Sequence, residues 1–281
     1  MNDPEIRPAP LAYENEQFLN SPDGRILRVL SEYVEPLARF RREQIQDTVV
    51  FFGSARVHSR DHANERLTEA HTNGVGMVAV EQAGEVKRAQ AAVDMSRYYE
   101  DARQLARLLT EWSIQIPAKR RRFVVTTGGG PGIMEAANLG ARDAGGKTIG
   151  LNINLPFEQV PNPYITPSLN FEFHYFFMRK FWFAYLAKAV IVFPGGYGTL
   201  DELFELLTLV QTRKMTKPMP IVLFGTDYWR DVVDFDALAR HGMISPEDTG
   251  LVHRTDSVDD AYDWIVAQLS AKALAKPGAT L

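Results

Sequence analysis

Short apolar runs alternate along the chain with longer segments in which apolar residues recur at helical spacing. Each run is three to five residues long, which suits a buried strand and is too short for a helix. Such alternation predicts a parallel sheet with helices on both faces, an α/β fold of the Rossmann-like, doubly wound type. The runs are residues 48–52, 123–125, 148–151, 189–193 and 221–224.

The stretches between these runs predict helices. Residues 57–112 are mostly polar and helix-forming, and we expect two helical pieces there with a break at Gly74 and Gly76. From Ser257 to about Ala275, apolar residues at helical spacing predict a terminal helix that packs on the sheet. The chain contains no internal repeat and no linker rich in Pro, Gly or Ser, so we expect a single domain.

A helical extension is predicted ahead of the first strand, from Ser21 to Arg42. Pro36 lacks an N–H and should kink this helix or split it near Glu35. One face of the helix is apolar, and we expect it to cover the sheet or a subunit contact without supplying a catalytic group. The apolar residues are Ile26, Leu27, Leu30, Val34, Leu37 and Phe40. The expected organisation is a flexible N-terminus (1–20), this extension (21–46) and the Rossmann-like domain (47–281).

Composition excludes several classes of function. Hydrophobic residues make up 45% and charged residues 23%, which excludes a disordered or fibrous chain. A formal net charge of −4 provides no broad positive surface for nucleic acid or an anionic membrane. The absence of cysteine excludes disulfides, thiolate metal sites and a cysteine nucleophile. With no apolar leader and no long apolar stretch, a cytoplasmic protein is expected.

Two local charge patterns have simple interpretations. The basic run KRRR at 119–122, ahead of a strand, is typical of a solvated turn rather than a nucleic-acid site. His58 and His62 have the spacing of two zinc ligands on a helix, but the Glu of H-E-x-x-H is missing. We therefore interpret them as a solvated helix face and expect no metal site.

Three loops that follow apolar runs have unusual sequences: GSAR at 53–56, GGGPGIME at 128–135 and PGGYGTLDE at 194–202. Ligands of doubly wound sheets bind beyond the carboxyl ends of the strands, so we expect these loops to meet at one edge. Each glycine-rich turn runs into a helix start, where unpaired N–H groups attract phosphate. One such turn alone would be as typical of a tight turn without a ligand, whereas two together favour a phosphate-containing ligand.

The same loops disfavour two common nucleotide sites. A dinucleotide fingerprint requires a third glycine where this chain has Ile133, and the next strand ends in Asn152 and Asn154 with no carboxylate for a ribose. A P-loop is approached by GGKT at 145–148, but that segment lies between a helix and a strand, the reverse of the required order. NAD is therefore not expected.

The segment PGGYGTLDE resembles the PGGxGTxxE motif of the LOG family, the cytokinin-activating nucleoside 5′-monophosphate phosphoribohydrolases once described as lysine decarboxylases. GGGPGIMEAAN at 128–138, GSAR at 53–56, LPFEQ at 155–159 and FFMRK at 176–180 are similar to further family motifs. Arg179 and Glu202 are 23 residues apart, like the essential Arg and Glu of the family. The chain resembles longer bacterial members with an N-terminal helix, and has Phe176-Phe177 where shorter plant-type members have Met-His.

The resemblance implies hydrolysis of the N-glycosidic bond of purine nucleoside 5′-monophosphates, AMP or cytokinin riboside monophosphates, to free base and ribose 5-phosphate. It also implies no metal or organic cofactor, and a homodimer or higher homo-oligomer. Glu202 would stabilise positive charge on the ribose or hold the attacking water, and Arg179 would bind phosphate or orient Glu202. The implied binding residues are Ser54, Gly129, Gly130, Glu158, Met178, Lys180, Gly195, Gly196, Tyr197, Gly198, Thr199 and Thr208.

Two alternative functions would use the same loops. A non-catalytic nucleotide sensor or carrier would bind the phosphate ligand without turnover. Glu202 counts against it, because a carboxylate beside a bound anion costs affinity. A PLP-dependent lysine decarboxylase has no support, because no lysine stands in a recognisable cofactor motif.

Overall fold

A seven-stranded parallel sheet forms the centre of the protein in the computed structural model, which describes residues 8–72, 79–156 and 160–274. The strand order is β4-β3-β2-β1-β5-β6-β7, so the direction in which strands are added reverses between β1 and β5. This order confirms the predicted Rossmann-like α/β fold. The strands are β1 (Thr48–Phe52), β2 (Val124–Thr127), β3 (Thr148–Ile153), β4 (Asn170–Phe173), β5 (Ala187–Val192), β6 (Ile221–Phe224) and β7 (Val252–Thr255).

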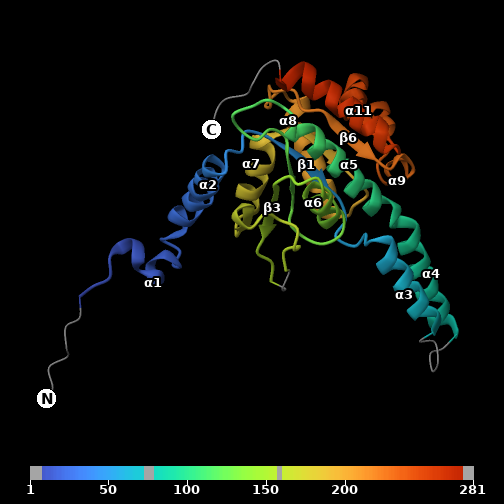
Figure 1. Cartoon of the computed structure of the whole chain (residues 1–281), viewed down its shortest axis with the longest axis horizontal. Coiled ribbons are helices and arrows are strands. Elements are labelled where there is room, and N and C mark those ends of the chain that lie inside the picture. The colour runs from blue at the N-terminus through green and yellow to red at the C-terminus, as the bar shows by residue number, and fades with distance from the viewer. Residues whose placement is uncertain (1–7, 73–78, 157–159, 275–281) are drawn as a thin grey trace.

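Helices cover both faces of the sheet (Figure 1). Alternate residues of β1 point to opposite layers: Val49 and Phe51 pack in one, and Val50 and Phe52 in the other. The first layer contains α5 (Arg97–Ile114), α6 (Ile133–Asp143) and α11 (Val258–Leu269), and the second contains α7 (Phe176–Leu186), α8 (Tyr197–Gln211) and α9 (Thr226–Val232). Shorter elements are η1 (Ala12–Glu14), α1 (Glu16–Leu19), η2 (Pro167–Leu169), α10 (Phe235–Arg240), η3 (Pro246–Leu251) and η4 (Ser270–Leu274).

Two strands at the edges of the sheet were not predicted. In β4 buried Phe171 and Phe173 alternate with exposed Asn170 and Glu172, and β7 contains His and Arg between its buried ends. An edge strand buries less of its surface than a central one, so it lacks the continuous apolar run by which the five other strands were recognised.

A helical hairpin of α3 (Arg60–Thr72) and α4 (Ala79–Met95) extends away from the sheet (Figure 1). Only Ser96 separates α4 from α5, and its N–H donates to the carbonyls of Ala92 and Val93. The region therefore contains three helices where two were expected, and the predicted break at Gly74 and Gly76 lies outside the described residues.

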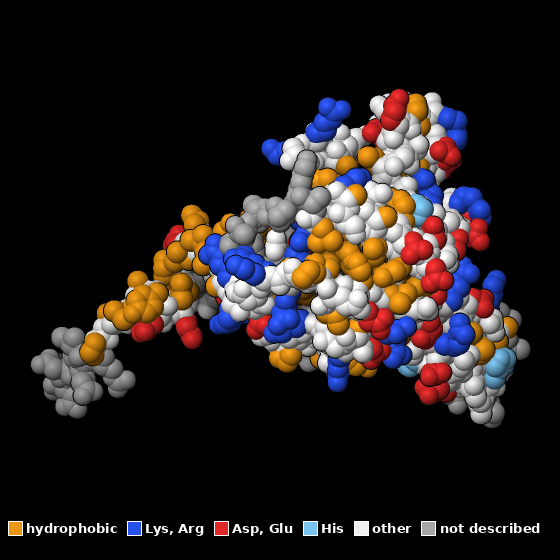
Figure 2. Space-filling view, turned by 45° about the horizontal axis from the view of Figure 1, so that its top comes forward, with side chains coloured by type: hydrophobic (Ala, Val, Ile, Leu, Met, Phe, Trp, Pro, Cys, Tyr) orange, Lys and Arg blue, Asp and Glu red, His pale blue; other side chains and the backbone are white. Residues whose placement is uncertain are grey.

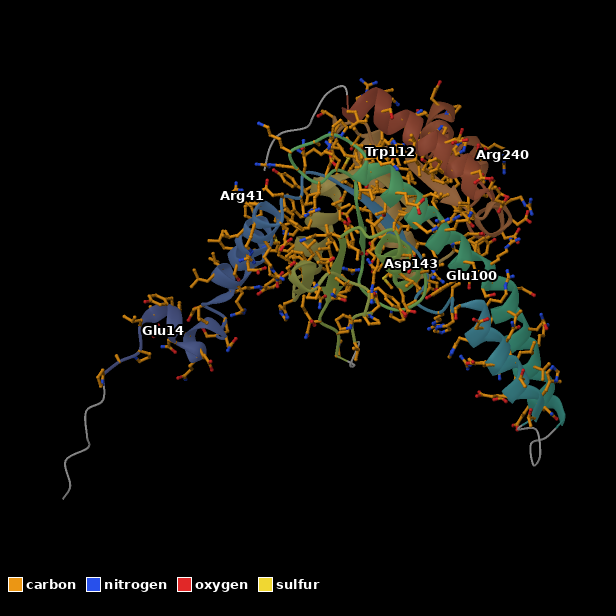
Figure 3. All side chains as sticks on the ribbon, in the orientation of Figure 1. Glu14, Arg41, Glu100, Trp112, Asp143 and Arg240 are labelled. Carbon is orange, nitrogen blue, oxygen red and sulfur yellow. The ribbon has the colours of Figure 1, made fainter. Side chains whose placement is uncertain are left out.

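Residues 8–42, which include most of the N-terminal extension, form an arm at the side of the molecule away from the α3–α4 hairpin, with Glu14 near the outer end of the arm (Figure 3). Its main helix, α2 (Arg25–Arg42), continues through Pro36 instead of being split there. Pro36 is buried, and one side chain on each side of it, Glu32 and Arg39, forms a hydrogen bond to the body of the protein. The Glu32 carbonyl, four residues before Pro36, accepts the indole N–H of Trp182 over 2.9 Å in place of the N–H that the proline lacks.

Most of the apolar face of α2 is not covered. Phe40 is buried, as expected, but 77% of Ile26 and 53% of Leu30 are exposed. The arm accordingly shows an extended hydrophobic surface (Figure 2).

Within the described residues, no helix is long and apolar enough to cross a membrane.

The basic run at 119–122 is not entirely a solvated turn. Arg122 is buried and its Nε lies 2.7 Å from Oδ2 of Asp47, just ahead of β1. The interpretation was wrong for Arg122 because a carboxylate distant in sequence neutralises the charge within the core.

Candidate active site

Three loops meet at the carboxyl ends of β1, β2 and β5. The Ser54 N–H donates to the Pro194 carbonyl over 2.9 Å, and the Ser54 carbonyl accepts the Ile133 N–H over 3.1 Å. Ser54 therefore joins the loop after β1 to both glycine-rich loops. This edge is the switch point of the doubly wound sheet, where such folds bind ligands.

Arg179 and Glu202 form an ion pair at this edge. Nη2 of Arg179, on α7, is 3.2 Å from Oε1 of Glu202, on α8, and 12% and 14% of the two side chains are exposed. The Arg179 Nε–H donates to the Leu151 carbonyl of β3 over 2.8 Å, and its guanidinium carbon lies 5.1 Å from the Phe183 ring centroid. The guanidinium is thus fixed against β3 while it faces the carboxylate.

Two glycines of the loop after β2 are required by their surroundings. A Cβ on Gly128 would lie 2.7 Å from Nη2 of Arg179, so glycine lets the loop approach the guanidinium. Gly129 has φ of +78°, a left-handed conformation that favours glycine, and a Cβ there would lie 2.1 Å from Oδ1 of Asn152. The GGG sequence therefore allows Arg179 to pack closely beside the end of β2.

Burial raises the pKa of Glu202 from 4.5 to about 7, and the positive charge of Arg179 opposes this shift. A carboxyl group with a pKa near neutrality can exchange a proton at physiological pH, which general acid–base chemistry requires. The electrostatics of the pair thus suit a reacting group.

The N-terminus of α8 is an open part of the site. Gly196, Tyr197 and Gly198 are exposed, with 93% of Tyr197 accessible. The N-cap residue is Gly196, which has no side chain to bond the first N–H groups of the helix. Thr199 is buried beside Gly195, where a Cβ would lie 2.1 Å from its Oγ1. The open N–H groups and the helix dipole suit a phosphate at this point.

A buried network that the sequence did not reveal supports the other glycine-rich loop. Gly129 and Gly130 are buried, and their carbonyls accept hydrogen bonds from Nδ2 of Asn162 over 3.1 and 3.0 Å. The same amide donates to Oδ1 of Asn138 over 2.9 Å, which also accepts the Thr127 hydroxyl over 2.7 Å. An asparagine between two prolines has no periodic signal, so sequence reasoning missed Asn162. The two glycines form part of the framework and are not open to solvent.

Tyr228 of α9 is a second supporting residue that was missed. Its hydroxyl donates to the Gly195 carbonyl over 2.6 Å. This bond fixes the peptide that enters the open turn of α8. The Tyr228 side chain comes from a helix that no motif connects to the loop.

Lys180 and Thr208 bond to groups other than the ion pair. Lys180 pairs instead with Asp201 and Glu205, at 2.8 and 3.0 Å. The Thr208 hydroxyl donates to the Phe204 carbonyl over 2.7 Å. Both residues line a hollow of about 420 Å³ along α8. They do not join the phosphate turn in this structure.

The remaining residues singled out from the sequence are Met178, Glu158, His58 and His62. Met178 is 8% exposed and packs in the hydrophobic core, and Glu158 lies outside the described residues. His58 is half-buried ahead of α3, so only His62 lies on a helix and the expected two-histidine helix face was wrong. Among the described side chains, no group of three or more His, Cys, Asp or Glu could hold a metal ion.

Comparisons with known proteins agree with this arrangement of motifs. A family model described as possible lysine decarboxylase matches residues 134–265. The chain is 30% identical to the probable cytokinin riboside 5′-monophosphate phosphoribohydrolase LOGL5 of Oryza sativa subsp. japonica, over 53% of this chain and 57% of that protein. The resemblance to the LOG family is confirmed.

Other relatives of this LOG-like chain include a cytokinin riboside 5′-monophosphate phosphoribohydrolase of Rhodococcoides fascians, 30% identical over 46% of this chain and 65% of that protein. The pyrimidine/purine nucleotide 5′-monophosphate nucleosidase of Escherichia coli (strain K12) is 30% identical over 48% of this chain and 33% of that protein. The chain thus spans less than two thirds of each of these relatives. Among solved structures, the molybdenum cofactor carrier protein MCP from Chlamydomonas reinhardtii is 18% identical, covering 80% of this chain and 99% of that chain with a TM-score of 0.46.

Proposed function

We propose that this protein hydrolyses the N-glycosidic bond of nucleoside 5′-monophosphates to free base and ribose 5-phosphate. The observation that supports this most directly is the ion pair of Arg179 and Glu202 beside the open N-terminus of α8. Glu202 follows Gly198 by about one helical turn, so a phosphate held at the turn brings the attached ribose toward the carboxylate. The names of the relatives support the same class of reaction.

The reaction develops positive charge on the ribose, because the electron pair of the N-glycosidic bond leaves with the base. An ionised Glu202 carboxylate stabilises that charge and accepts a proton from the water whose oxygen bonds to C1′. The departing base nitrogen takes up a proton, so the net reaction adds one water molecule across the N-glycosidic bond. Arg179 holds the carboxylate in place with a planar charged group.

The substrate class that we propose is purine nucleoside 5′-monophosphates, with AMP as the reference substrate. The names of relatives mention cytokinin riboside monophosphates as well as purine and pyrimidine nucleotides. Phe176 and Phe177, at the start of α7, are about half exposed and differ from the Met-His pair of shorter members of the family. The preferred base therefore has to be measured.

Incubation of the full chain with nucleotides tests the function. AMP, CMP, isopentenyladenosine monophosphate and adenosine would each be supplied, and free base measured by chromatography. We expect base release from at least one monophosphate and little from adenosine, which leaves the phosphate turn empty. Equal rates with adenosine and AMP would contradict the proposal, and tight AMP binding without base release would favour a carrier.

We further propose that the protein is a homo-oligomer in which the arm contacts a second copy. Exposed large apolar residues gather in this arm (Figure 2), and burying each contributes about 1.5–3 kcal/mol. These exposed apolar residues are Leu11, Tyr13, Phe18, Ile26, Leu27, Leu30, Tyr33 and Val34. Light scattering would measure the native mass, and replacing Ile26 and Leu30 with Ser should lower that mass.

A further inference from the structure

One acidic residue of the N-terminal extension, Glu32, bonds to the helix that carries Arg179. Its carboxylate accepts two backbone N–H groups, from His174 at Oε1 over 2.7 Å and from Tyr175 at Oε2 over 3.2 Å. The Glu32 carbonyl accepts the indole N–H of Trp182 over 2.9 Å. Three hydrogen bonds thus connect this residue of α2 to the start and the second turn of α7.

These bonds lead to Arg179 through a single residue, Tyr175. Tyr175 is the N-cap residue of α7, and its carbonyl accepts the Arg179 N–H over 3.2 Å. Glu32 accepts the N–H groups of Tyr175 and of His174 before it, so it fixes the backbone that leads into α7. A carboxylate at this end also interacts favourably with the helix dipole.

Further contacts hold α2 in register with β4 and α7. The Arg39 guanidinium donates to the Asn170 carbonyl over 2.8 Å. The Tyr33 ring stacks on Trp182 with centroids 5.7 Å apart, and Phe40 lies 4.9 Å from Phe171. Glu32 therefore stands where the anchored part of α2 begins, and Ile26, about one and a half turns earlier, is exposed.

We propose that Glu32 is a positioning residue for Arg179: it fixes the backbone that enters α7 and thereby sets where the guanidinium lies relative to Glu202. Glu32 does not contact the site where the ribose would bind, and it acts through the first turn of α7. This inference rests on the proposed function of the Arg179 and Glu202 pair. It also gives the N-terminal extension a part in the site, which the sequence did not predict.

Three variants of the full chain test the proposal. Glu32→Ala removes both acceptor oxygens, and Glu32→Gln keeps one oxygen without the charge. Glu35→Ala is the matched control, because Glu35 lies one turn further on the same helix and pairs with Arg39, not with α7. We expect kcat/KM for AMP to fall about tenfold or more in Glu32→Ala, less in Glu32→Gln and little in Glu35→Ala, since small misplacements of reacting groups are costly.

The pH profile distinguishes positioning from loss of folded protein. Glu202 faces the cations Arg179 and Lys180 of α7 and the carboxylates Asp201 and Glu205 of α8. Displacing the start of α7 weakens the cationic side, so the acidic limb of the kcat/KM profile should move to higher pH in Glu32→Ala. An unchanged limb in Glu32→Ala would overturn the proposal.

Amide hydrogen exchange over residues 174–180 provides a readout that does not depend on turnover. We expect faster exchange at the Tyr175 and Arg179 amides in Glu32→Ala than in Glu35→Ala. If the unmodified chain releases no base from any nucleotide, the proposed function fails, and exchange still decides whether Glu32 anchors Arg179. Equal exchange in the two variants would overturn the anchoring itself.

Discussion

Two arginine–carboxylate pairs lie at opposite ends of the strands of the sheet. They differ in how many hydrogen bonds the carboxylate accepts. Ahead of β1, Asp47 accepts the Arg122 Nε–H and the Phe123 N–H, each over 2.7 Å. At the carboxyl ends of the strands, Glu202 lies 3.2 Å from Arg179 and adjoins the open turn of α8. The first pair is 1% and 5% exposed, whereas Glu202 keeps 14% exposure.

The difference separates a structural ion pair from the pair that we propose to be reactive. Each oxygen of Asp47 already has a hydrogen-bond donor, and Arg122 also donates to the Ala273 carbonyl over 3.1 Å, so this pair links distant segments of the chain. Burial raises the pKa of Glu202 to about 7, and its side chain is still 14% exposed, so it can take a proton or a new partner. Burial alone does not make an ion pair a candidate active site. A carboxylate that can still accept further hydrogen bonds, beside an open loop, is what distinguishes Glu202 from Asp47.

Removing the structural carboxylate should have the largest effect. Asp47→Ala leaves Arg122 buried without its counterion, and the free energy of unfolding should fall by about 3–5 kcal/mol. Because the pair lies at the edge away from Glu202, kcat per folded molecule should stay near that of the unmodified chain. Urea unfolding and rates normalised to the amount of folded protein check both points, and a large loss of kcat in folded protein would show that Asp47 also affects the site.

The reactive carboxylate should show the opposite pattern. Glu202→Gln keeps the shape of the side chain but cannot ionise, so base release should fall by about 10²–10³-fold, the scale of a lost charge-stabilising group. Nucleotide binding and the fold should persist. Calorimetric titration with AMP and measurement of free base test this, and near-normal turnover would refute the role assigned to Glu202.

Replacing each arginine with lysine sharpens the contrast. In Arg179→Lys the charge remains, but one amine cannot reproduce both the bond to Leu151 and the contact with Glu202, so base release should fall about 10–100-fold. Arg122→Lys is the matched change at the other edge and should lower the melting temperature without changing kcat. The reverse assignment of the two effects would contradict the distinction.

The Arg179 and Glu202 pair could be located from the sequence, whereas the Arg122 and Asp47 pair could not. Arg179 and Glu202 stand in motifs beside turns that mark strand ends, so local pattern is sufficient. Arg122 and Asp47 are 75 residues apart and meet because β1 pairs with β2, and neither has a motif of its own. Asn162 was missed for the same reason, because its role depends on a loop folding back over the glycine turn.

The two long amphipathic helices show a second limit of sequence reasoning. α2 and α5 have 18 residues each and an apolar face, yet α5 buries Leu105 and Leu109 while α2 leaves Ile26 and Leu30 exposed. Periodicity predicts which face is apolar, but what covers that face depends on tertiary or quaternary contacts. The apolar runs predicted the central strands well for the converse reason, because both of their faces are buried within this chain.

The smallest effect that we predict is on the pH dependence of stability. The folded-state pKa of Glu202, about 7, lies above the ordinary 4.5, so between these pH values the folded chain holds a proton that the unfolded chain has released. Stability should therefore fall as pH rises from about 4.5 to 7 and should then level off. Glu202→Gln removes this dependence, and because the carboxyl is partly exposed beside Arg179 we expect the variant to gain about 1–2 kcal/mol over the unmodified chain between pH 5 and pH 8. Urea unfolding at both pH values measures the difference, and a constant gap between the two proteins would show that Glu202 does not titrate in this range.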